Sequence, residues 1–90
     1  MNPRIKAVKP NPDYTLTLTF TNGEVKRFDA KPYLSIGIFR ELRDLGTFNS
    51  VRPFLGSVQW ANGQDFCPDT LYEESVSVLE EIVVEEKIAA

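Results

Sequence analysis

The stretch that decides the fold runs from residue 58 to residue 72 and reads Val58-Gln59-Trp60-Ala61-Asn62-Gly63-Gln64-Asp65-Phe66-Cys67-Pro68-Asp69-Thr70-Leu71-Tyr72. Its first three residues alternate apolar and polar side chains, which is typical of a half-buried strand. Asn62-Gly63 predicts a tight turn, because both residues tolerate positive φ angles. A second short strand through Phe66 then leads to Pro68, which suits the first turn of a helix.

The composition outside this stretch predicts one globular domain. The chain has 90 residues, of which 42% are hydrophobic, and this is enough for a small core without disulfides or metal. The single cysteine, Cys67, excludes an intrachain disulfide, and the chain has no histidine. We therefore expect no metal site built on these residue types, and nothing in the sequence predicts a cofactor. A lone thiol fits a reducing compartment, so we expect a cytoplasmic protein.

No membrane segment is expected. The apolar runs are at most three residues long, as in Ile82-Val83-Val84, far short of the ~20 residues that span a bilayer. The first residues also lack the apolar core of a signal peptide.

Charge is divided unevenly along the chain. Residues 1–53 hold nine Lys and Arg against five Asp and Glu, a net charge of +4, whereas residues 54–90 hold one against eight, a net charge of −7. The basic residues lie at ordinary density on predicted strands, whereas proteins that track phosphates carry a dense basic surface. We therefore expect a solvated surface, and a nucleic-acid partner remains an alternative for the first half only.

Three strands are expected before residue 30. The first covers residues 4–9 and lies at a sheet edge, because Pro10 follows it. The second covers residues 14–20, where strict alternation places four apolar side chains on one face. Asn22-Gly23 predicts a hairpin to a third strand over residues 24–28, in which a bulge or a register shift would bring Val25 and Phe28 into phase.

Helical signals follow this hairpin. One turn is predicted at residues 31–34, with Asp29 as N-cap and Pro32 in its first turn. A longer helix is predicted from Ile38 to Leu45, where apolar residues recur at i, i+4 and i+7, and Gly46 is expected at its C-cap. A further strand is expected within residues 47–54.

The fold class that these elements predict is α+β, with a small antiparallel sheet in two layers. It comprises three N-terminal strands, a helix, two or more further strands and a C-terminal helix. We assign residues 1–75 to a single domain and residues 76–90 to an acidic C-terminal extension, helical or partly disordered. As a helix, this region would align Tyr72, Val76, Leu79 and Val83, but its β-branched residues are equally compatible with an extended segment.

A family resemblance rests on four motifs. In chain order they are Tyr14-x-Leu16-x-Leu18-x-Phe20-x-Asn22-Gly23-Glu24, Phe28-Asp29, Phe39-Arg40-Glu41-Leu42 and Val58-x-Trp60-x-Asn62-Gly63-x-Asp65-x-x-x-Asp69-x-Leu71-Tyr72. Over about residues 4 to 74 the chain resembles the small bacterial domain-of-unknown-function family numbered 2442. The Trp-x-Asn-Gly-x-Asp element with the downstream Asp-x-Leu-Tyr is the most specific of these motifs.

The resemblance implies an α+β fold of three strands, a helix, two or more strands and a terminal helix. It also implies a bacterial protein that is often encoded beside another small uncharacterised protein, a pairing similar to toxin and antitoxin. The family carries no established catalytic residues, and residues 76–90 extend beyond its usual length.

The candidate interaction surface comprises Trp60, Asn62, Asp65, Asp69, Tyr72, Leu79 and Val83. Asp65 and Asp69 are close enough in sequence to hold Mg²⁺ or to divide acid and base roles. We favour structural roles for them, because an Asp after a turn accepts backbone hydrogen bonds and an Asp in a first helical turn offsets the helix dipole. Trp60 is also a candidate core residue, and Cys67 is expected to be buried.

Three function classes follow from these features. We favour a protein-interaction or regulatory module, such as the antitoxin-like member of a two-gene system, in which the acidic tail binds a small protein partner. A nucleic-acid-associated regulator is the alternative, and a metal- or carboxylate-dependent enzyme is less favoured, so we expect no catalytic activity. A homodimer through an edge strand or the tail is compatible with all three classes.

Overall fold

The computed structural model describes residues 2–78 and places a four-stranded antiparallel sheet at the centre of the fold, in the order β1-β2-β3-β6. Its strands are β1 (Ile5–Pro10), β2 (Thr15–Phe20), β3 (Val25–Asp29) and β6 (Val76–Ser77). A second, two-stranded sheet pairs β4 (Arg52–Phe54) with β5 (Ser57–Gln59). The helical elements are η1 (Lys31–Tyr33), η2 (Gly37–Arg43), α1 (Leu45–Phe48) and α2 (Pro68–Glu74). The predicted α+β fold class is confirmed.

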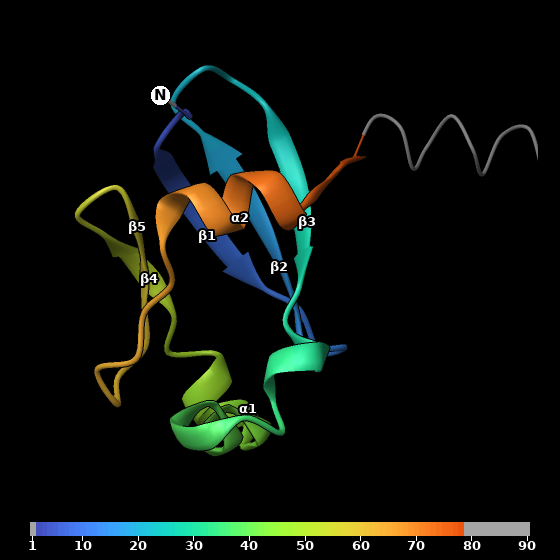
Figure 1. The fold of residues 1–90 in the computed structure, drawn as a ribbon, viewed down its shortest axis with the longest axis vertical. Coiled ribbons are helices and arrows are strands. Elements are labelled where there is room, and N and C mark those ends of the chain that lie inside the picture. Colours follow the sequence, from blue (N-terminus) through green and yellow to red (C-terminus); the bar gives the residue numbers. More distant parts are fainter. Residues whose placement is uncertain (1, 79–90) are drawn as a thin grey trace, which may run out of the picture.

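The central sheet has one covered face and one outer face. Figure 1 shows α2 lying across the covered face, with the β4–β5 hairpin beside it. The predicted alternation in β2 explains this asymmetry, because Leu16, Leu18 and Phe20 are fully buried on the covered face. The threonines between them face the other way. Helix α2 and the β4–β5 hairpin therefore belong to the second layer, which covers these three side chains.

Phe66 lies at the centre of the aromatic core. Its ring centroid is 4.9 Å from that of Phe39, 5.0 Å from Tyr33, 5.1 Å from Phe28 and 5.6 Å from Trp60. These rings come from five different parts of the chain, and offset or edge-to-face pairs add to the stabilisation from buried area. The segment between β5 and α2 thus joins the two halves of the fold, although only Asp65, opposite Gln59, forms a strand-like bridge there.

The β2–β3 hairpin forms at Asn22-Gly23 as predicted. Gly23 has a φ angle of 90°, and the Asn22 side chain accepts a hydrogen bond from the Glu24 amide at 3.0 Å. The prediction of a bulge or a register shift between Val25 and Phe28 is wrong. The five β2–β3 pairs run from Thr15↔Asp29 to Thr19↔Val25 without a shift. Val25 and Phe28 simply face opposite sides of the sheet. The register shift occurs in β1 instead, between Ile5 and Ala7.

The helix predicted from Ile38 to Leu45 is wrong in type and length. A 3-10 helix, η2, occupies residues 37–43, and Asp44 then leaves the helical conformation with φ −73° and ψ 118°. The reason is local: the Asp44 carboxylate accepts hydrogen bonds from the Thr47 amide at 2.9 Å and from the Thr47 hydroxyl at 3.0 Å, so it caps a new helix. Gly46 lies inside α1 and is not a C-cap. The strand expected within residues 47–54 is present as β4.

The single turn predicted at residues 31–34 is present as η1, with Pro32 in its first turn. Its N-cap is Ala30, but the Asp29 side chain still accepts a hydrogen bond from the Lys31 amide at 3.0 Å. Pro68 opens α2 as predicted. Helix α2 ends at Glu74, and Val76–Ser77 form β6, so the extended alternative holds for these two residues. No helix within the described range is long and apolar enough to cross a membrane.

Candidate functional site

Trp60 belongs to the core and not to a contact surface. Only 1% of the residue is exposed, and its indole N–H donates a hydrogen bond to the Phe48 carbonyl at 3.0 Å. This buried bond satisfies the polar group of the ring and links β5 to the end of α1. Trp60 is therefore too buried to contact a partner on the candidate surface that the sequence predicted around it.

Asn62 forms the predicted turn and is engaged within the fold. Its side-chain oxygen accepts a hydrogen bond from the Gln64 amide at 3.0 Å, and its amide group donates to the Glu41 carboxylate at 2.7 Å. Gly63 has a φ angle of 87°, which the Asn-Gly pair predicted. Asn62 thereby fastens the turn after β5 to η2, which is a structural role.

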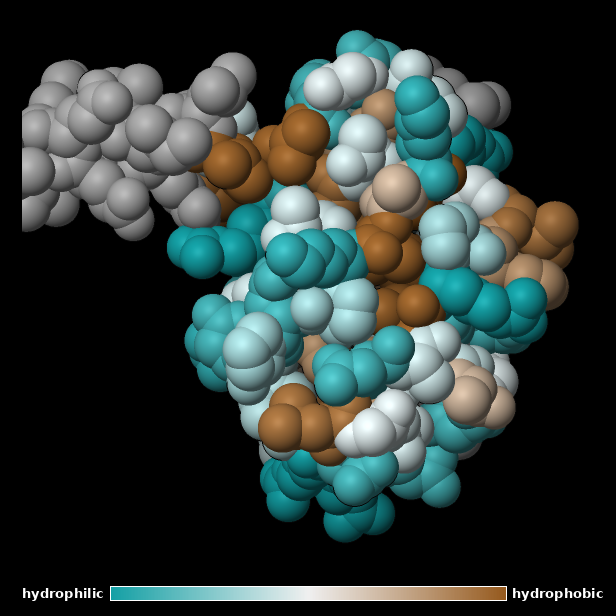
Figure 2. Space-filling view, turned by 180° about the vertical axis from the view of Figure 1, so that it is seen from behind, coloured by the Kyte–Doolittle hydropathy of each residue, from teal (hydrophilic) through white to brown (hydrophobic). Residues whose placement is uncertain are grey.

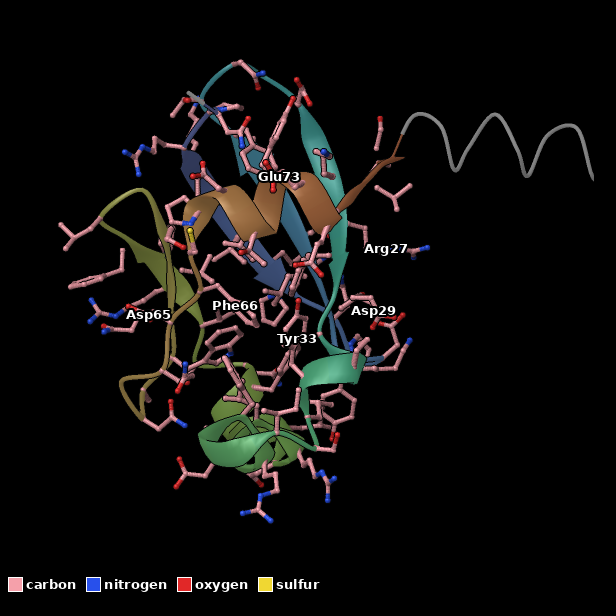
Figure 3. The ribbon with its side chains drawn as sticks, in the orientation of Figure 1. Arg27, Asp29, Tyr33, Asp65, Phe66 and Glu73 are labelled. Atoms are coloured by element: carbon pink, nitrogen blue, oxygen red, sulfur yellow. The ribbon has the colours of Figure 1, made fainter. Side chains whose placement is uncertain are left out.

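Asp65 and Asp69 both lie exposed at the surface. Asp69 is in the first turn of α2 and accepts a hydrogen bond from the Asn2 side chain at 3.3 Å. Figure 3 shows Asp65 on the segment that follows β5, at the outside of the fold. Within residues 2–78, no group of three or more Asp, Glu, Cys or His is placed to hold a metal ion.

Tyr72 ties α2 to the β2–β3 turn. Its hydroxyl donates to the two oxygens of the Glu24 carboxylate, at 2.8 and 3.1 Å, and this hydrogen bond is the main cause of a raised Tyr72 pKa and of a lowered Glu24 pKa. The Lys26 ammonium lies 4.0 Å from the centre of the Tyr72 ring and donates to the Tyr72 carbonyl at 2.6 Å. Leu79 and Val83, the last two predicted surface residues, lie outside the described residues.

A second tyrosine, Tyr33, which no sequence motif singled out, ties α2 to η1. The Tyr33 hydroxyl donates to both oxygens of the Glu74 carboxylate, at 2.7 and 2.9 Å, which raises the Tyr33 pKa. Its ring also packs against Phe66, and Figure 3 shows the two side chains directed toward each other in the interior. Two tyrosine–glutamate pairs therefore connect α2 to the rest of the fold, one to the β2–β3 turn and one to η1.

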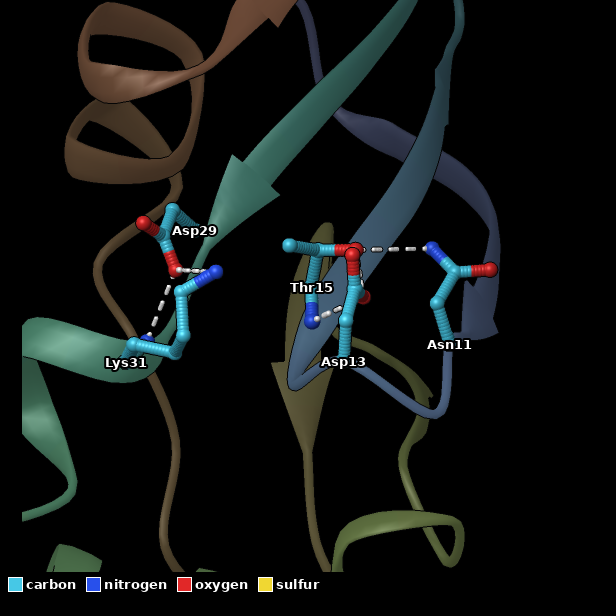
Figure 4. Close-up of polar contacts among 5 residues, drawn as sticks. All are labelled: Asn11, Asp13, Thr15, Asp29 and Lys31. Carbon is cyan, nitrogen blue, oxygen red and sulfur yellow. Dashed lines mark hydrogen bonds and ion pairs between the residues drawn. The ribbon is translucent and has the colours of Figure 1, made fainter.

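A polar network, also missed, closes the turn between β1 and β2 (Figure 4). The Asp13 carboxylate accepts hydrogen bonds from the Thr15 hydroxyl at 2.6 Å and from the Thr15 amide at 3.2 Å. The Asn11 side chain donates to the hydroxyls of Thr15 and Thr17, at 3.1 and 3.0 Å. The hydrogen bond from the Thr15 side chain is the main cause of a lowered Asp13 pKa. Asn-Pro-Asp already indicates a turn at residues 11–13, and the Asp-x-Thr sequence was the available signal for its side-chain network.

The outer face of the sheet is lined by one cross-strand row. Lys9, Thr17, Arg27 and Val76 lie opposite one another on β1, β2, β3 and β6. Figure 2 views the molecule from behind: hydrophilic and neutral residues cover much of it, and hydrophobic residues gather in patches, one of them where the described chain ends. A shallow hollow of about 490 Å³ lies on this face, lined by both polar and apolar side chains.

One apolar patch of this face lies at its border, which we term the β6 edge and define as β6 with Val25 and Val78. Val76 and Val25 are 47% and 39% exposed. Val25 and Val78 also line a second hollow, of about 360 Å³, with Gly23, Glu24 and Ser77. The alternation Ser75-Val76-Ser77-Val78 was the sequence signal for this strand, and the helical stripe through Tyr72 and Val76 competed with it.

Cys67 is exposed, so the expectation that it is buried is wrong. It occupies the N-cap position of α2 without a side-chain hydrogen bond, and the neighbouring Phe66 fills the core in its place.

The fold defines the class of protein as a small α+β domain built on an antiparallel sheet with one covered and one outer face. The chain belongs to the family described as Protein of unknown function (DUF2442), whose model matches residues 5–77. The matched range begins at the first residue of β1 and ends at the last residue of β6, so β6 is part of the family domain. Comparisons with curated proteins and with solved structures give no match.

Proposed function

We propose that this chain is a protein-interaction module that binds a small protein partner through the β6 edge and the outer face of the sheet. The observation that carries the proposal is the gathering of exposed valines at the border of the outer face, with a hollow beside them. Exposed apolar groups that lie together on a small domain indicate a contact surface. A regulatory role, such as that of an antitoxin-like member of a two-gene pair, is the form of this function that we favour.

The candidate interaction surface predicted around Trp60 is less suited to binding. Trp60, Asn62 and Tyr72 all use their polar groups within the fold. A partner that bound there would have to compete with these hydrogen bonds, and each is worth about 1 kcal/mol or more when charged groups take part. The proposal therefore moves the interaction surface from the surroundings of Trp60 to the β6 edge, which the acidic residues 79–87 follow in the sequence.

The proposal assigns no catalytic role to the chain. Asp65 and Asp69 are exposed, and Asp69 is engaged by Asn2. It places the protein in the cytoplasm, because an exposed free thiol such as Cys67 is stable in a reducing compartment.

The test is affinity capture from the cells that encode the chain, with two tagged baits, residues 1–90 and residues 1–78. The shorter bait keeps β6, so it separates the contribution of the acidic segment from that of the folded domain. We expect one small protein to co-purify with the full chain and to bind it at about 1:1 stoichiometry when both are pure. If the pure full-length chain retains no protein, the interaction-module proposal fails.

A nucleic-acid partner is the second candidate, and the placement of Lys9 and Arg27 in one row of the outer face favours it. Binding that depends on phosphate contacts weakens steeply with salt, whereas binding through an apolar edge does not. Titration of labelled duplex DNA and single-stranded RNA at ~50 and ~200 mM salt distinguishes the two. Tight binding that falls by orders of magnitude over this range supports the nucleic-acid candidate.

A further inference from the structure

The two edges of the central sheet differ in their protection against strand pairing. The β1 edge carries Lys6, Lys9 and Pro10 and a register shift after Ile5, all of which hinder the addition of another strand. The Ile5 amide is also occupied, since it donates to the Gly56 carbonyl at 3.0 Å. An approaching strand therefore finds the β1 edge closed.

The β6 edge has none of these protections in its own sequence. Residues 75–78 read Ser-Val-Ser-Val, without charge or proline, and their alternation suits a pleated strand. In the part of the chain that the structure describes, β6 pairs with β3 on one side and with no strand on the other. The outward-directed backbone groups of a terminal strand are available for hydrogen bonds with an added strand.

A hollow beside β6 can hold a side chain of an added strand. The hollow of about 360 Å³ lies between the β2–β3 turn and β6, and Val25 and Val78 line it. In strand addition, backbone hydrogen bonds supply affinity and pockets for alternate side chains supply specificity. A β-branched side chain of an added strand fits a hollow of this kind.

The charges on both sides of β6 define the partner further. Glu73 and Glu74 precede the uncharged residues 75–78, and Glu80 and Glu81 follow them in the sequence. The uncharged segment thus lies between two pairs of glutamates in the sequence, and the described pair, Glu73 and Glu74, is exposed at the end of α2, directly before β6. A strand with basic ends is complementary to this pattern, whereas a second copy of the same segment brings Glu against Glu.

We propose that the β6 edge accepts an extended segment of a partner protein, with β-branched residues at its centre and Lys or Arg at both ends, as a fifth strand of the sheet. The inference rests on the proposed function and names its binding mode and the chemistry of its partner.

The direct test is a titration of the purified chain 1–90 with two fluorescent peptides, Lys-Lys-Thr-Val-Thr-Val-Lys-Lys and Glu-Glu-Thr-Val-Thr-Val-Glu-Glu. We expect the basic peptide to bind at least about tenfold more tightly at low salt, because several charge pairs of modest strength add up. Equal binding of both peptides, or binding of neither, overturns the proposal.

Two variants locate the binding. Val76→Lys places a charge on the β6 edge at a half-exposed position, and Val78→Lys does so beyond the strand pairs with β3. Leu55→Lys is the matched control, since Leu55 is 85% exposed at the tip of the β4–β5 hairpin. We expect each valine variant to weaken binding of the basic peptide by about tenfold or more, and the control to stay within about twofold of the unchanged chain. Equal losses in all three variants contradict the assignment, and thermal unfolding of each variant verifies that it is folded.

N-methylated peptides test whether the basic peptide binds β6 through backbone hydrogen bonds. Two further versions of the basic peptide carry N-methyl groups on alternate residues. In an extended strand, the methylated amides of one version point to one edge, and those of the other version point to the opposite edge. Strand addition predicts that one version loses binding and the other keeps it, because one edge of the added strand faces β6. Loss in both versions, or in neither, overturns this mode of binding.

Self-pairing and failure of the proposed function give different results. A concentration-dependent dimer in analytical ultracentrifugation that Val76→Lys abolishes and Leu55→Lys leaves intact overturns the proposal in favour of a second copy. If a captured partner binds the Val76→Lys and Val78→Lys variants as well as the unchanged chain, the interaction function stands and the β6 edge is not its site. If no partner is captured, the proposed function itself fails.

Discussion

Tyr14 and Leu55 adopt a backbone conformation that is unfavourable for their residue types. Their φ angles are 65° and 50°, in the left-handed region that glycine and asparagine prefer. The Tyr14 ring lies 5.3 Å from that of Phe48, and its hydroxyl donates to the Arg43 carbonyl. Leu55, in contrast, is 85% exposed. The packing of Tyr14 offsets the cost of its conformation, and Leu55 has little packing to do so.

Replacement by asparagine should therefore have opposite effects at these two positions. Leu55→Asn should raise the free energy of unfolding by roughly 0.5–1 kcal/mol, because Asn tolerates the left-handed conformation and almost no packing is lost. Tyr14→Asn should lower it by roughly 2–4 kcal/mol through the lost ring contact and hydrogen bond. Urea unfolding of both variants measures these changes. A destabilised Leu55→Asn variant would show that the leucine side chain supports the fold.

Trp60→Phe tests the buried hydrogen bond between β5 and α1. The phenyl ring fills most of the space, but it cannot donate to the Phe48 carbonyl, which remains buried. The Phe48 carbonyl keeps its hydrogen bond from the Val51 amide at 3.4 Å. We therefore expect the free energy of unfolding to fall by roughly 1–3 kcal/mol, from the lost indole hydrogen bond and the smaller ring together. An unchanged urea midpoint would mean that the indole hydrogen bond contributes nothing measurable to stability.

At the scale of elements, α2 is held by two tyrosine–glutamate hydrogen bonds, from Tyr33 to Glu74 and from Tyr72 to Glu24. Each raises the tyrosine pKa above its ordinary value of 10.0, with the hydrogen bond as the largest cause. The folded state therefore favours the neutral phenol. This contribution to stability is complete below pH 10.0 and is lost as the pH rises through the higher folded-state pKa values.

The double variant Tyr33→Phe/Tyr72→Phe should show a weaker loss of stability at alkaline pH than the unchanged chain. Urea midpoints measured between pH 8 and pH 11 give this comparison, and about pH 10 is where the two curves should begin to converge. Parallel curves over the whole range would show that other groups control the alkaline transition.

The elements that the sequence predicted correctly are those whose signals are local. Alternation specifies β2, Asn-Gly specifies the turns at residues 22–23 and 62–63, and Pro68 specifies the start of α2. The prediction of a helix at residues 38–45 is wrong because the Asp44 side chain caps a new helix by accepting a hydrogen bond from the Thr47 amide. The spacing of apolar residues contains no information about such a cap. Strand β6 depends on Lys26 and Arg27, some fifty residues away, so its own two residues do not determine it. The sequence left Trp60 between a core role and a surface role, and only the folded chain shows that the Phe48 carbonyl accepts its buried indole N–H.

At the scale of the whole molecule, the folded unit extends to the last strand of the sheet. The family match ends at Ser77, and β6 adds the fourth strand to β3. The boundary expected at residue 75 would remove that strand. A boundary after Val78 keeps the sheet complete.

Two truncated chains test this boundary. A chain of residues 1–78 should unfold with the same midpoint as residues 1–90, whereas a chain of residues 1–75 should lose roughly 1–2 kcal/mol, since it lacks the hydrogen bonds between β6 and β3. Urea unfolding of the three chains gives the answer. A large loss in residues 1–78 would show instead that the acidic segment packs on the domain.

The central claim is that a partner segment adds to the sheet at the β6 edge, and amide hydrogen exchange measures this most directly. We would compare the exchange of residues 1–90 alone with that of the same chain saturated with the peptide Lys-Lys-Thr-Val-Thr-Val-Lys-Lys. The claim predicts that exchange of amides in residues 75–78 slows by about tenfold or more, while exchange in β1 is unchanged. Protection at β1 without protection at residues 75–78 would contradict it.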